Sequence, residues 1–503
     1  MNDSDNAVDY EVIIVGAGFS GIGSAIQLQK AGIHDFVILE KADDIGGTWR
    51  ENTYPGVCVD VFSWGYCYAF EPNPNWQHTF ARGHELKAYA DHCVDKYGLR
   101  QHLRLNTEVT KAGFDEGRHL WRVDTAVGSL TSRFVMIAPG GFNHPKRPDI
   151  EGLDDFAGTV IHSARWDHDH DLTGERVAVI GTGASGVQLI PEVAKAAERL
   201  HVFQRTPIWS HPTFDVRIPR ALQTVFRRFP RLMLLPRLLN NLAIETFFFF
   251  GIRFNGPWLV TLMERLSLAM LRIQVPDPRV RAALRPNYRF GCKFPALSNR
   301  YYRTFARHNV ELVTAPIERI TETGIVTTDG QHREIDTLVL ATGFKIYERD
   351  VLPPFPEVGR DGVELGEFFE ENRYAAYEGT SLPGWPNAWA ILGPYAVTGS
   401  FFLMIDNSTT HAVRCILEAR RRGATCVEVK QEPHRRFFEE MVRRQGKSLF
   451  YNSNCERAHS FYFDKFGDVA LIRPSSGVSA WWRARHFPMD DYEFTSRSGP
   501  SER

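Results

Sequence analysis

The chain of 503 residues is long enough for two or three domains, each with its own hydrophobic core. Its 59 basic and 60 acidic side chains give a net charge of −1, which does not favour nucleic acid as a partner. The seven cysteines are scattered and form no Cys-x-x-Cys pair, so they favour reduced thiols over a disulfide framework or a zinc site. The polar N-terminus predicts no signal peptide. No apolar run is expected to reach the ~18 residues of a membrane span, and the expected location is the cytoplasm.

Residues 10–40 predict a strand, a glycine-rich turn, a helix and a second strand. The apolar run Tyr10–Val15 is typical of a buried parallel strand, the helix is expected to extend to about Leu28, and the strand Phe36–Leu39 ends at Glu40. In a GxGxxG turn the first glycine forms the bend, the second admits a pyrophosphate and the third lets the helix pack on the strand. A carboxylate at the end of the second strand accepts hydrogen bonds from ribose hydroxyls. The predicted contacts of this dinucleotide site are Gly16, Gly18, Ser20, Gly21 and Glu40.

The same plan returns at residues 177–206, with a strand, a second GxGxxG turn, a helix and a strand. Two such units predict an α/β fold with two Rossmann-type dinucleotide-binding domains. The second unit ends in Arg205-Thr206 instead of an acid, and this pair favours the 2′-phosphate of NADPH over NADH. Residues 335–343 predict another buried strand. The predicted contacts of the second site are Gly181, Gly183, Ser185, Gly186, Arg205 and Thr206.

Residues 217–287 differ in composition and predict a helical insertion in the second nucleotide domain. The segment is rich in Arg, Leu and Phe and contains few acids. One interpretation is a helical lid whose Phe247–Phe250 run lines an apolar pocket; the other is peripheral contact with an anionic membrane surface. The predicted domains are an FAD-binding domain (1–150 and 380–503), an NADPH-binding domain (151–216 and 288–379) and the insertion (217–287).

The segment Trp166–Asp171 alternates acids with histidines in a way that superficially suggests a metal site. Alternating ligand types in a polar loop are more often a solvated connector, and no distant partner is indicated. The sequence therefore predicts no metal site.

These motifs resemble the Baeyer–Villiger monooxygenases, class B flavoprotein monooxygenases with two dinucleotide domains. The most specific match is Phe156–Asp167, which fits the family fingerprint FxGxxxHxxxW followed by Pro or Asp and precedes the second glycine-rich turn, as in the family. The C-terminal segment matches loosely, through Cys455, Tyr462 and Gly467. Further matches in family order are Gly46–Trp49, Tyr54–Gly56 with Asp60, Gly291–Lys293 with Ser298 and Tyr301–Tyr302, and Ala341–Gly343.

The resemblance implies that the chain binds FAD and NADPH. It also implies that the chain inserts one atom of O2 into a small apolar substrate, such as a ketone that becomes an ester or lactone, through a peroxide at C4a of the flavin. Asp60 would lie near the reactive face of the flavin, His162 would couple the two nucleotide domains, and Lys293 would contact a phosphate of NADPH. These three are the candidate catalytic residues. Further implied cofactor contacts are Gly47, Thr48, Trp49, Tyr66, Val109, Ala341, Thr342 and Gly343, besides Asp60 and Lys293.

The most important departure from the family pattern is Phe294, which stands where the family has an Arg directly after the Lys. In the family this Arg, held by the Asp equivalent to Asp60, stabilises the peroxide anion and the oxyanion that forms on a ketone. Either Arg289, Arg300 or Arg165 replaces it, or ketone oxidation is not the native reaction.

Baeyer–Villiger oxygenation remains the first prediction, with three alternatives. The neutral hydroperoxide can oxygenate sulfur or amines without the anion, so Phe294 impairs that reaction less. The chain could also be an NADPH oxidase or reductase that has lost productive oxygen transfer. The third alternative is a redox sensor that binds both nucleotides without turnover. The oligomeric state is left open.

Overall fold

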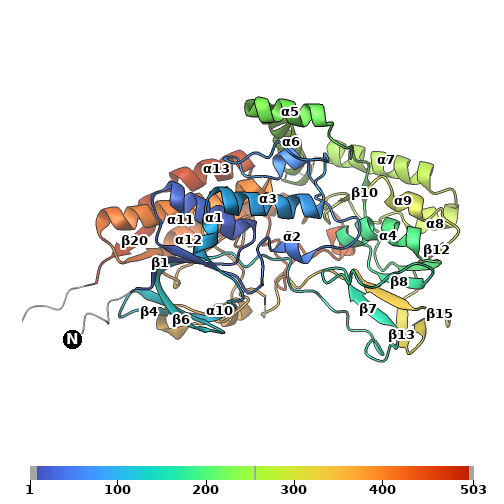
Figure 1. The fold of residues 1–503 in the computed structure, drawn as a ribbon, viewed down its shortest axis with the longest axis horizontal. Coiled ribbons are helices and arrows are strands. Elements are labelled where there is room, and N and C mark those ends of the chain that lie inside the picture. Colours follow the sequence, from blue (N-terminus) through green and yellow to red (C-terminus); the bar gives the residue numbers. More distant parts are fainter. Residues whose placement is uncertain (1–7, 254–255, 350, 498–503) are drawn as a thin grey trace, which may run out of the picture.

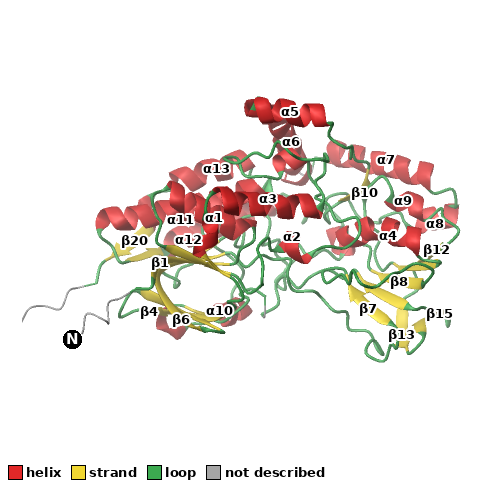
Figure 2. Ribbon diagram, viewed as in Figure 1, coloured by secondary structure: helices red, strands yellow, loops and turns green. Residues whose placement is uncertain are grey.

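The computed structural model describes residues 8–253, 256–349 and 351–497, with only the backbone of residues 248–250. Two separate sheets lie side by side, largely beneath a layer of helices in the orientation shown (Figures 1 and 2). The fold is therefore α/β, as the sequence predicted.

The first sheet carries the first glycine-rich turn. It has eight strands in the order β17-β4-β5-β6-β1-β2-β3, and β18 pairs with β6. β1 runs parallel to β2 and β6, and its central residues are completely buried, as expected for a strand covered on both faces. The predicted strands at Tyr10–Val15 and Phe36–Leu39 are confirmed. The strands are β1 (Tyr10–Val15), β2 (Phe36–Leu39), β3 (Leu103–Arg104), β4 (Val109–Asp115), β5 (Leu120–Thr125), β6 (Gly128–Ile137), β17 (Glu357–Val358) and β18 (Ala388–Ala390).

The C-terminal segment packs onto the helices of this first sheet. Ser24 and Thr409 share a hydrogen bond of 3.2 Å between their hydroxyls, and the Gln27 amide donates to Asp406 at 2.7 Å. The helix predicted to extend to about Leu28 is confirmed as α1 (Phe19–Lys30), and the other helices on this side before the C-terminal segment are α2 (Thr48–Glu51), α3 (Gly83–Lys96) and α10 (Leu365–Glu371). Sequence patterns did not resolve the elements of the C-terminal segment, which are α11 (Phe401–Arg422), α12 (Gln431–Gln445), α13 (Gly477–His486), and the strand pair β19 (Cys426–Val429) and β20 (Tyr492–Thr495).

The second sheet carries the second glycine-rich turn and is entirely parallel, in the order β12-β9-β8-β16-β7. The strands predicted at residues 177–181 and 200–204 and within 335–343 are confirmed as β8, β9 and β16. The elements here are β7 (Thr159–His162), β8 (Arg176–Ile180), β9 (Arg199–Phe203), β12 (Val310–Val313), β16 (Thr337–Leu340), α4 (Ala184–Ala196) and α9 (Tyr301–Thr304). A small antiparallel sheet follows, formed by β13 (Ile317–Thr321), β14 (Gly324–Thr327) and β15 (His332–Glu334).

We propose that the first sheet with the C-terminal segment forms the FAD domain and the second sheet the NADPH domain. Because β17 pairs with β4 of the first sheet, the chain returns to the proposed FAD domain before residue 357, earlier than the predicted boundary at 380.

The insertion is helical, as predicted. Its two ends meet, because β10 (Ser210–His211) pairs with β11 (Ala296–Leu297). One run, Pro230–Arg253, has 24 residues and a mean hydropathy of 1.2, so its length and composition would allow it to cross a membrane. This corrects the expectation that no apolar segment is long enough for a membrane span. Helices that never enter a membrane meet the same two criteria, so the run alone does not establish a span. The elements are α5 (Arg220–Arg228), α6 (Leu234–Thr246), α7 (Pro257–Gln274), α8 (Pro278–Ala283) and the short helical turns η4 (Pro230–Met233) and η5 (Phe247–Arg253).

The prediction that all cysteines are reduced thiols is wrong for one pair. Cys292 and Cys455 form a disulfide across 163 residues, with their Cα atoms 4.9 Å apart. The other five cysteines are free thiols. Sequence spacing could not indicate the pair, because only the folding of the C-terminal segment onto the chain near residue 292 brings the two together.

Candidate active site

The turn between β1 and α1 forms a cradle without side chains. Gly16 has a φ of +100°, and a Cβ there would lie 2.4 Å from the carbonyl oxygen of Ala138. A Cβ on Gly21 would lie 1.8 Å from the carbonyl oxygen of Gly16. By contrast, a Cβ on Gly18 would meet nothing nearer than the Cα of Gly47 at 3.6 Å. No side chain caps α1 at Gly18, so the first-turn N–H groups face open space where a pyrophosphate fits.

Glu40 lies beside this cradle at the end of β2. Its carboxylate accepts hydrogen bonds from the N–H of Ala17 at 2.7 Å and from the N–H of Ala42 at 3.0 Å. An ionised carboxylate has about four acceptor positions, so two remain for ribose hydroxyls. Ser20 is buried in the first turn of α1.

The predicted flavin contacts gather next to the first cradle. Gly47 has a φ of +52° and precedes Thr48, the first residue of α2. The indole N–H of Trp49 donates to the hydroxyl of Tyr66 at 3.3 Å, and the two rings meet edge to face. Val109 begins β4 and is buried in the core of the first sheet.

The second cradle repeats this geometry between β8 and α4. Gly181 has a φ of +112°, and a Cβ there would lie 2.3 Å from the carbonyl oxygen of Ala341. A Cβ on Gly186 would lie 2.4 Å from the carbonyl oxygen of Gly181, whereas a Cβ on Gly183 would meet no atom within 4 Å. No side chain caps α4 at Gly183. The open side again faces a helix N-terminus, which suits a second pyrophosphate.

Cationic side chains collect at the end of β9. Arg205 is exposed, and the carbonyl oxygen of Thr206 accepts a hydrogen bond from the Thr182 hydroxyl at 3.2 Å. Burial lowers the pKa of Lys293, and the positive charge of Arg205 lowers it further, so these two cations lie near each other. Two neighbouring positive charges repel each other unless an anion lies between them. The 2′-phosphate of NADPH would be such an anion.

Arg205→Ala is expected to erase a preference for NADPH over NADH. A hydrogen bond to a charged group contributes about 1.5–3 kcal/mol, so kcat/KM for NADPH should fall roughly 10- to 100-fold while kcat/KM for NADH changes little. Steady-state rates with both nucleotides measure this. Arg199→Ala, at the other end of β9, is the matched control and should leave the preference intact. Equal efficiency with both nucleotides in the wild type would contradict the assignment.

Asp60 accepts a hydrogen bond from a residue of α4, the helix that follows the second cradle. The Gln188 side-chain amide, on α4, donates to the Asp60 carboxylate at 3.2 Å and to the carbonyl oxygen of Cys58 at 3.1 Å. Its oxygen accepts from the Tyr54 hydroxyl at 2.9 Å and from the N–H of Cys58 at 3.2 Å. All four positions of the amide are therefore used. Burial raises the pKa of Asp60 to about 7, against which the Gln188 hydrogen bond acts.

Asp60→Asn is expected to stabilise the FAD-loaded protein increasingly as the pH rises from about 4 to about 7. Between those values the folded wild type keeps a proton that the unfolded chain, whose carboxyl ionises near pH 3.8, has lost. Wild-type stability therefore falls with rising pH, by up to about 4 kcal/mol, and asparagine avoids this loss while still accepting from Gln188. Thermal melts of both proteins at pH 5 and pH 8 measure the difference. Parallel pH dependences would rule out the raised pKa.

Each of the three arginines that were candidates to replace the missing family arginine forms an ion pair with a glutamate. Arg289 lies 2.9 Å from Glu264, Arg165 lies 2.7 Å from Glu51, and Arg300 pairs with Glu192. Phe294 packs against the core that surrounds the disulfide. Within residues 8–253, 256–349 and 351–497, no guanidinium forms an ion pair with Asp60.

His162 is the last residue of β7 and lies beside Thr342, which follows β16. Its Nδ1 accepts from the N–H of Ala164 at 3.1 Å, and its Nε2 lies 3.4 Å from the hydroxyl of Thr342. Burial lowers the pKa of His162, and Arg165 lowers it further, so the imidazole is neutral near pH 7. Next to Thr342, Gly343 has a φ of +80°, which allows the chain to turn away from His162. This position agrees with a structural coupling role.

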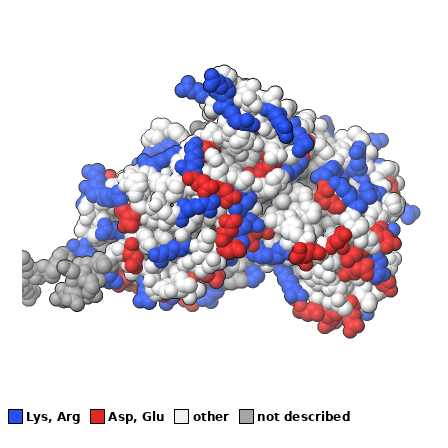
Figure 3. Space-filling model, viewed as in Figure 1, with Lys and Arg blue, Asp and Glu red and all other residues white. Residues whose placement is uncertain are grey.

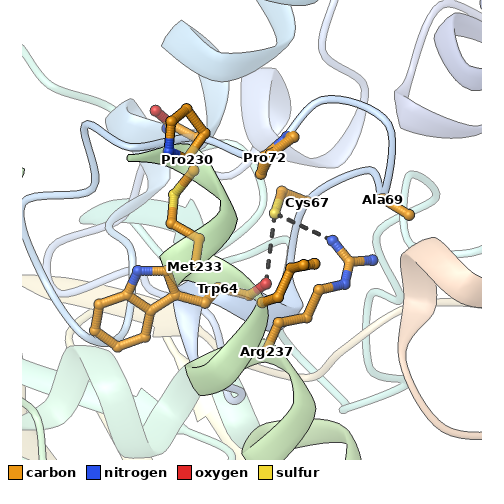
Figure 4. Close-up of a pocket in the computed structure, with 9 residues that line it drawn as sticks. Trp64, Cys67, Ala69, Pro72, Pro230, Met233 and Arg237 are labelled. Atoms are coloured by element: carbon orange, nitrogen blue, oxygen red, sulfur yellow. Dashed lines mark hydrogen bonds between the residues drawn. The ribbon is translucent and has the colours of Figure 1, made fainter. Parts of the chain in front are cut away.

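Two other features have no place in the site. Among the described residues, no group of three or more His, Cys, Asp or Glu side chains is arranged to hold a metal ion. A cavity of about 20 Å³ lies between the FAD side and the insertion, lined among others by Trp64, Cys67, Met233 and Arg237 (Figure 4). It has room for roughly one water, so it is not a substrate pocket. The side chains of the predicted lining residues 248–250 lie outside the described part of the chain.

Gln188 and Tyr54 join the halves of the site; sequence reasoning missed Gln188 and named Tyr54 only as part of a family motif. The Tyr54 hydroxyl interacts with Ser185 as well as Gln188, and Gly56 approaches the backbone of Gln188 so closely that a Cβ would lie 2.6 Å from its carbonyl oxygen. The sequence signal that could have found Gln188 was its place two positions after the last glycine of the second GxGxxG turn.

Known proteins resemble the chain over most of its length. Residues 13–228 match the family model described as pyridine nucleotide-disulphide oxidoreductase. A Baeyer-Villiger monooxygenase from Streptomyces coelicolor is 35% identical over 96% of this chain and 92% of its own length, and one from Pseudomonas aeruginosa is 37% identical over 89% and 84%. The solved structure of OTEMO in complex with FAD and NADP superposes with a TM-score of 0.85 at 27% identity, covering 97% of this chain and 100% of that one.

The two glycine-rich cradles and the near full-length similarity to known proteins point to one family. The non-catalytic sensor is thereby set aside. The chain belongs to the Baeyer–Villiger monooxygenase family and is an FAD- and NADPH-dependent monooxygenase.

Proposed function

We propose that this enzyme inserts one atom of O2 into small apolar organic molecules and oxygenates thioethers in preference to ketones. When bound, NADPH supplies a hydride and reduced FAD activates O2. Two observations support the proposal. Asp60 is buried with Gln188 as its hydrogen-bond partner and pairs with no guanidinium of the described residues, and Phe294 stands in place of the family arginine.

The missing cation changes which oxygen transfer the protein favours. Attack on a ketone needs a negatively charged oxygen and moves that charge onto the former carbonyl oxygen. In a site that excludes water, a fixed cation lowers the barrier to this step by several kcal/mol. Transfer to a thioether sulfur uses a neutral, electrophilic oxygen and needs no such cation. With a pKa of about 7, Asp60 is largely protonated just below neutral pH and can donate a hydrogen bond there.

A panel of matched substrates tests the proposal. Purified enzyme with NADPH is given a ketone, a thioether and an amine of similar size, and NADPH consumed, product and hydrogen peroxide are measured together. We expect more sulfoxide than ester, and peroxide for a sizeable share of the NADPH. Ester as the main, well-coupled product would overturn the preference and leave conversion of ketones to esters as the function, which the names of the relatives support. Peroxide alone would indicate an NADPH oxidase.

We also propose that the insertion contacts an anionic membrane surface. Residues 220–242 contain five arginines and no acid, and basic residues cover the projecting α5 (Figure 3). Six of the seven leucines on the same stretch are more than half exposed, including Leu234, Leu235 and Leu238 at 61–64%. Exposed leucines between arginines suit a surface that is both apolar and negatively charged.

Sedimentation with vesicles tests this contact. Binding to phosphatidylglycerol vesicles should exceed binding to phosphatidylcholine vesicles and weaken at high salt. The triple substitution of Leu234, Leu235 and Leu238 by serine should reduce it at least 10-fold, since each leucine contributes on the order of 1 kcal/mol or more of apolar burial. Val127→Ser, at an exposed turn of the first sheet, is the control. Equal binding of wild type and triple variant would refute the contact.

A further inference from the structure

Three parts of the chain meet around the disulfide. The insertion contributes Ile252 and Val260, the segment before Lys293 contributes Phe290, and the C-terminal segment contributes Leu449, all to one buried core. Cys292 and Cys455 lie within this core and are fully buried. The core thus joins the chain that enters the NADPH site to a C-terminal segment that packs on the first sheet.

Hydrogen bonds on both sides of the disulfide align the two segments. The N–H of Arg289 donates to the side-chain oxygen of Asn454 at 3.0 Å, and the Asn454 amide donates to the carbonyl oxygen of Asn287 at 2.9 Å. The N–H of Leu449 donates to the carbonyl oxygen of Ile252 at 2.8 Å. The cysteines are therefore held facing each other by contacts that do not require the S–S bond.

Cys292 directly precedes Lys293, and the positive charge of Arg205 lowers the pKa of that lysine. We propose that Cys292 and Cys455 form a redox site, oxidised to the disulfide by hydrogen peroxide and reduced by small dithiols, and that the crosslink holds Lys293 in position for NADPH. The crosslink restricts the segment before the nucleotide binds, so less conformational freedom is lost on binding.

The reaction balances with peroxide as the oxidant. One thiol, as the thiolate, attacks an oxygen of hydrogen peroxide, the O–O bond breaks, and a sulfenic acid and water form after proton transfer. The second thiol attacks that sulfur, the S–O bond breaks, and the disulfide and a second water form. Two electrons from the sulfurs reduce one peroxide to two waters, and a dithiol reverses the change by exchange, becoming a cyclic disulfide itself.

The source of the peroxide rests on the proposed function. When NADPH is consumed without oxygen transfer to a substrate, NADPH, H⁺ and O2 are converted to NADP⁺ and hydrogen peroxide. Geometry distinguishes this pair from the other five cysteines, which are free thiols. Cys292 and Cys455 face each other with their Cα atoms 4.9 Å apart, so a sulfenic acid on one meets the thiol of the other.

Thiol counting on the FAD-loaded full chain tests the site without turnover. Protein treated with peroxide, or with dithiothreitol, is denatured in an alkylating reagent and analysed by mass spectrometry. We expect five alkylated cysteines after peroxide, with Cys292 and Cys455 in one linked peptide, and seven after dithiothreitol. Seven alkylated cysteines after peroxide would overturn the redox site.

Calorimetric titration with NADP⁺ tests the consequence. Reduction should weaken NADP⁺ binding by about 10-fold in the wild type, as expected when preorganisation is lost. Cys455→Ser should bind with the weaker affinity and no longer respond to dithiothreitol, whereas Cys426→Ser should behave as the wild type. If Cys455→Ser fails to fold, the reduced and oxidised wild type still give the comparison. Equal affinities in the two states would overturn the role at Lys293. Neither measurement depends on which substrate is oxygenated, so failure here is distinguishable from failure of the proposed function.

Discussion

Gly18→Val should yield a folded protein that retains almost no FAD. The backbone at Gly18, with φ −74° and ψ −176°, is extended and open to any residue, and the nearest atom to a new Cβ is 3.6 Å away. Folding should therefore survive. The valine methyl groups, however, would occupy the space in front of the uncapped N-terminus of α1, which a pyrophosphate needs. We expect FAD occupancy to fall to less than about a tenth of the wild-type value, corresponding to more than ~1.4 kcal/mol.

The second cradle supplies the matched control. Gly183 has nearly the same backbone conformation, and a Cβ at this position would have no atom within 4 Å. Gly183→Val should stay yellow, while its flavin is no longer reduced by NADPH in the absence of oxygen. The flavin-to-protein absorbance ratio and circular dichroism measure occupancy and folding. A yellow Gly18→Val protein with normal occupancy would contradict the placement of FAD at the first cradle.

Phe294→Arg should raise ketone oxidation by roughly 10- to 100-fold, the range expected when a charge-stabilising donor is restored. Asp60 would then have a cation to pair with, and the anionic oxygen that attacks a carbonyl would be stabilised. The same change should lower the pKa of Asp60, because an adjacent positive charge favours the carboxylate. Rates of ester formation across pH 6 to 9 measure both effects.

Two variants separate charge from shape in this experiment. Phe294→Leu removes the ring without adding charge and should leave ketone oxidation low. Asp60→Asn combined with Phe294→Arg should lose most of the gain, since the guanidinium then lacks its partner. A wild-type enzyme that already forms ester efficiently and with little peroxide would show that another cation serves this role.

The parts of the site that could be predicted are local in sequence. Gly16 and Gly181 each need a positive φ, and this constraint arises within one strand, turn and helix. The backbone oxygens of Ala138 and Ala341, which a Cβ at these positions would approach to 2.4 and 2.3 Å, add a second constraint that comes from distant segments. Arg205 follows from its place at the end of a strand. The same local patterns gave β1, β2, β8, β9 and β16 close to their observed bounds.

The parts that could not be predicted depend on contacts between distant segments. Gln188 lies 128 residues from Asp60, and only the approach of the two halves brings its amide to that carboxylate. Cys292 and Cys455 meet because the C-terminal segment folds back across 163 residues. The family pattern identified Phe294 as unusual, but the partners of Arg165, Arg289 and Arg300 required the structure.

A single substrate that carries both a thioether and a ketone tests the central claim most directly. Both groups then meet the same enzyme, the same nucleotide and the same activated oxygen, so the product ratio depends only on which transfer the site favours. Because Asp60 pairs with Gln188 and with no guanidinium in the described part of the chain, we expect the sulfoxide as the main product and the ester as a minor one. Ester as the main product, formed with one NADPH per oxygen inserted, would contradict it.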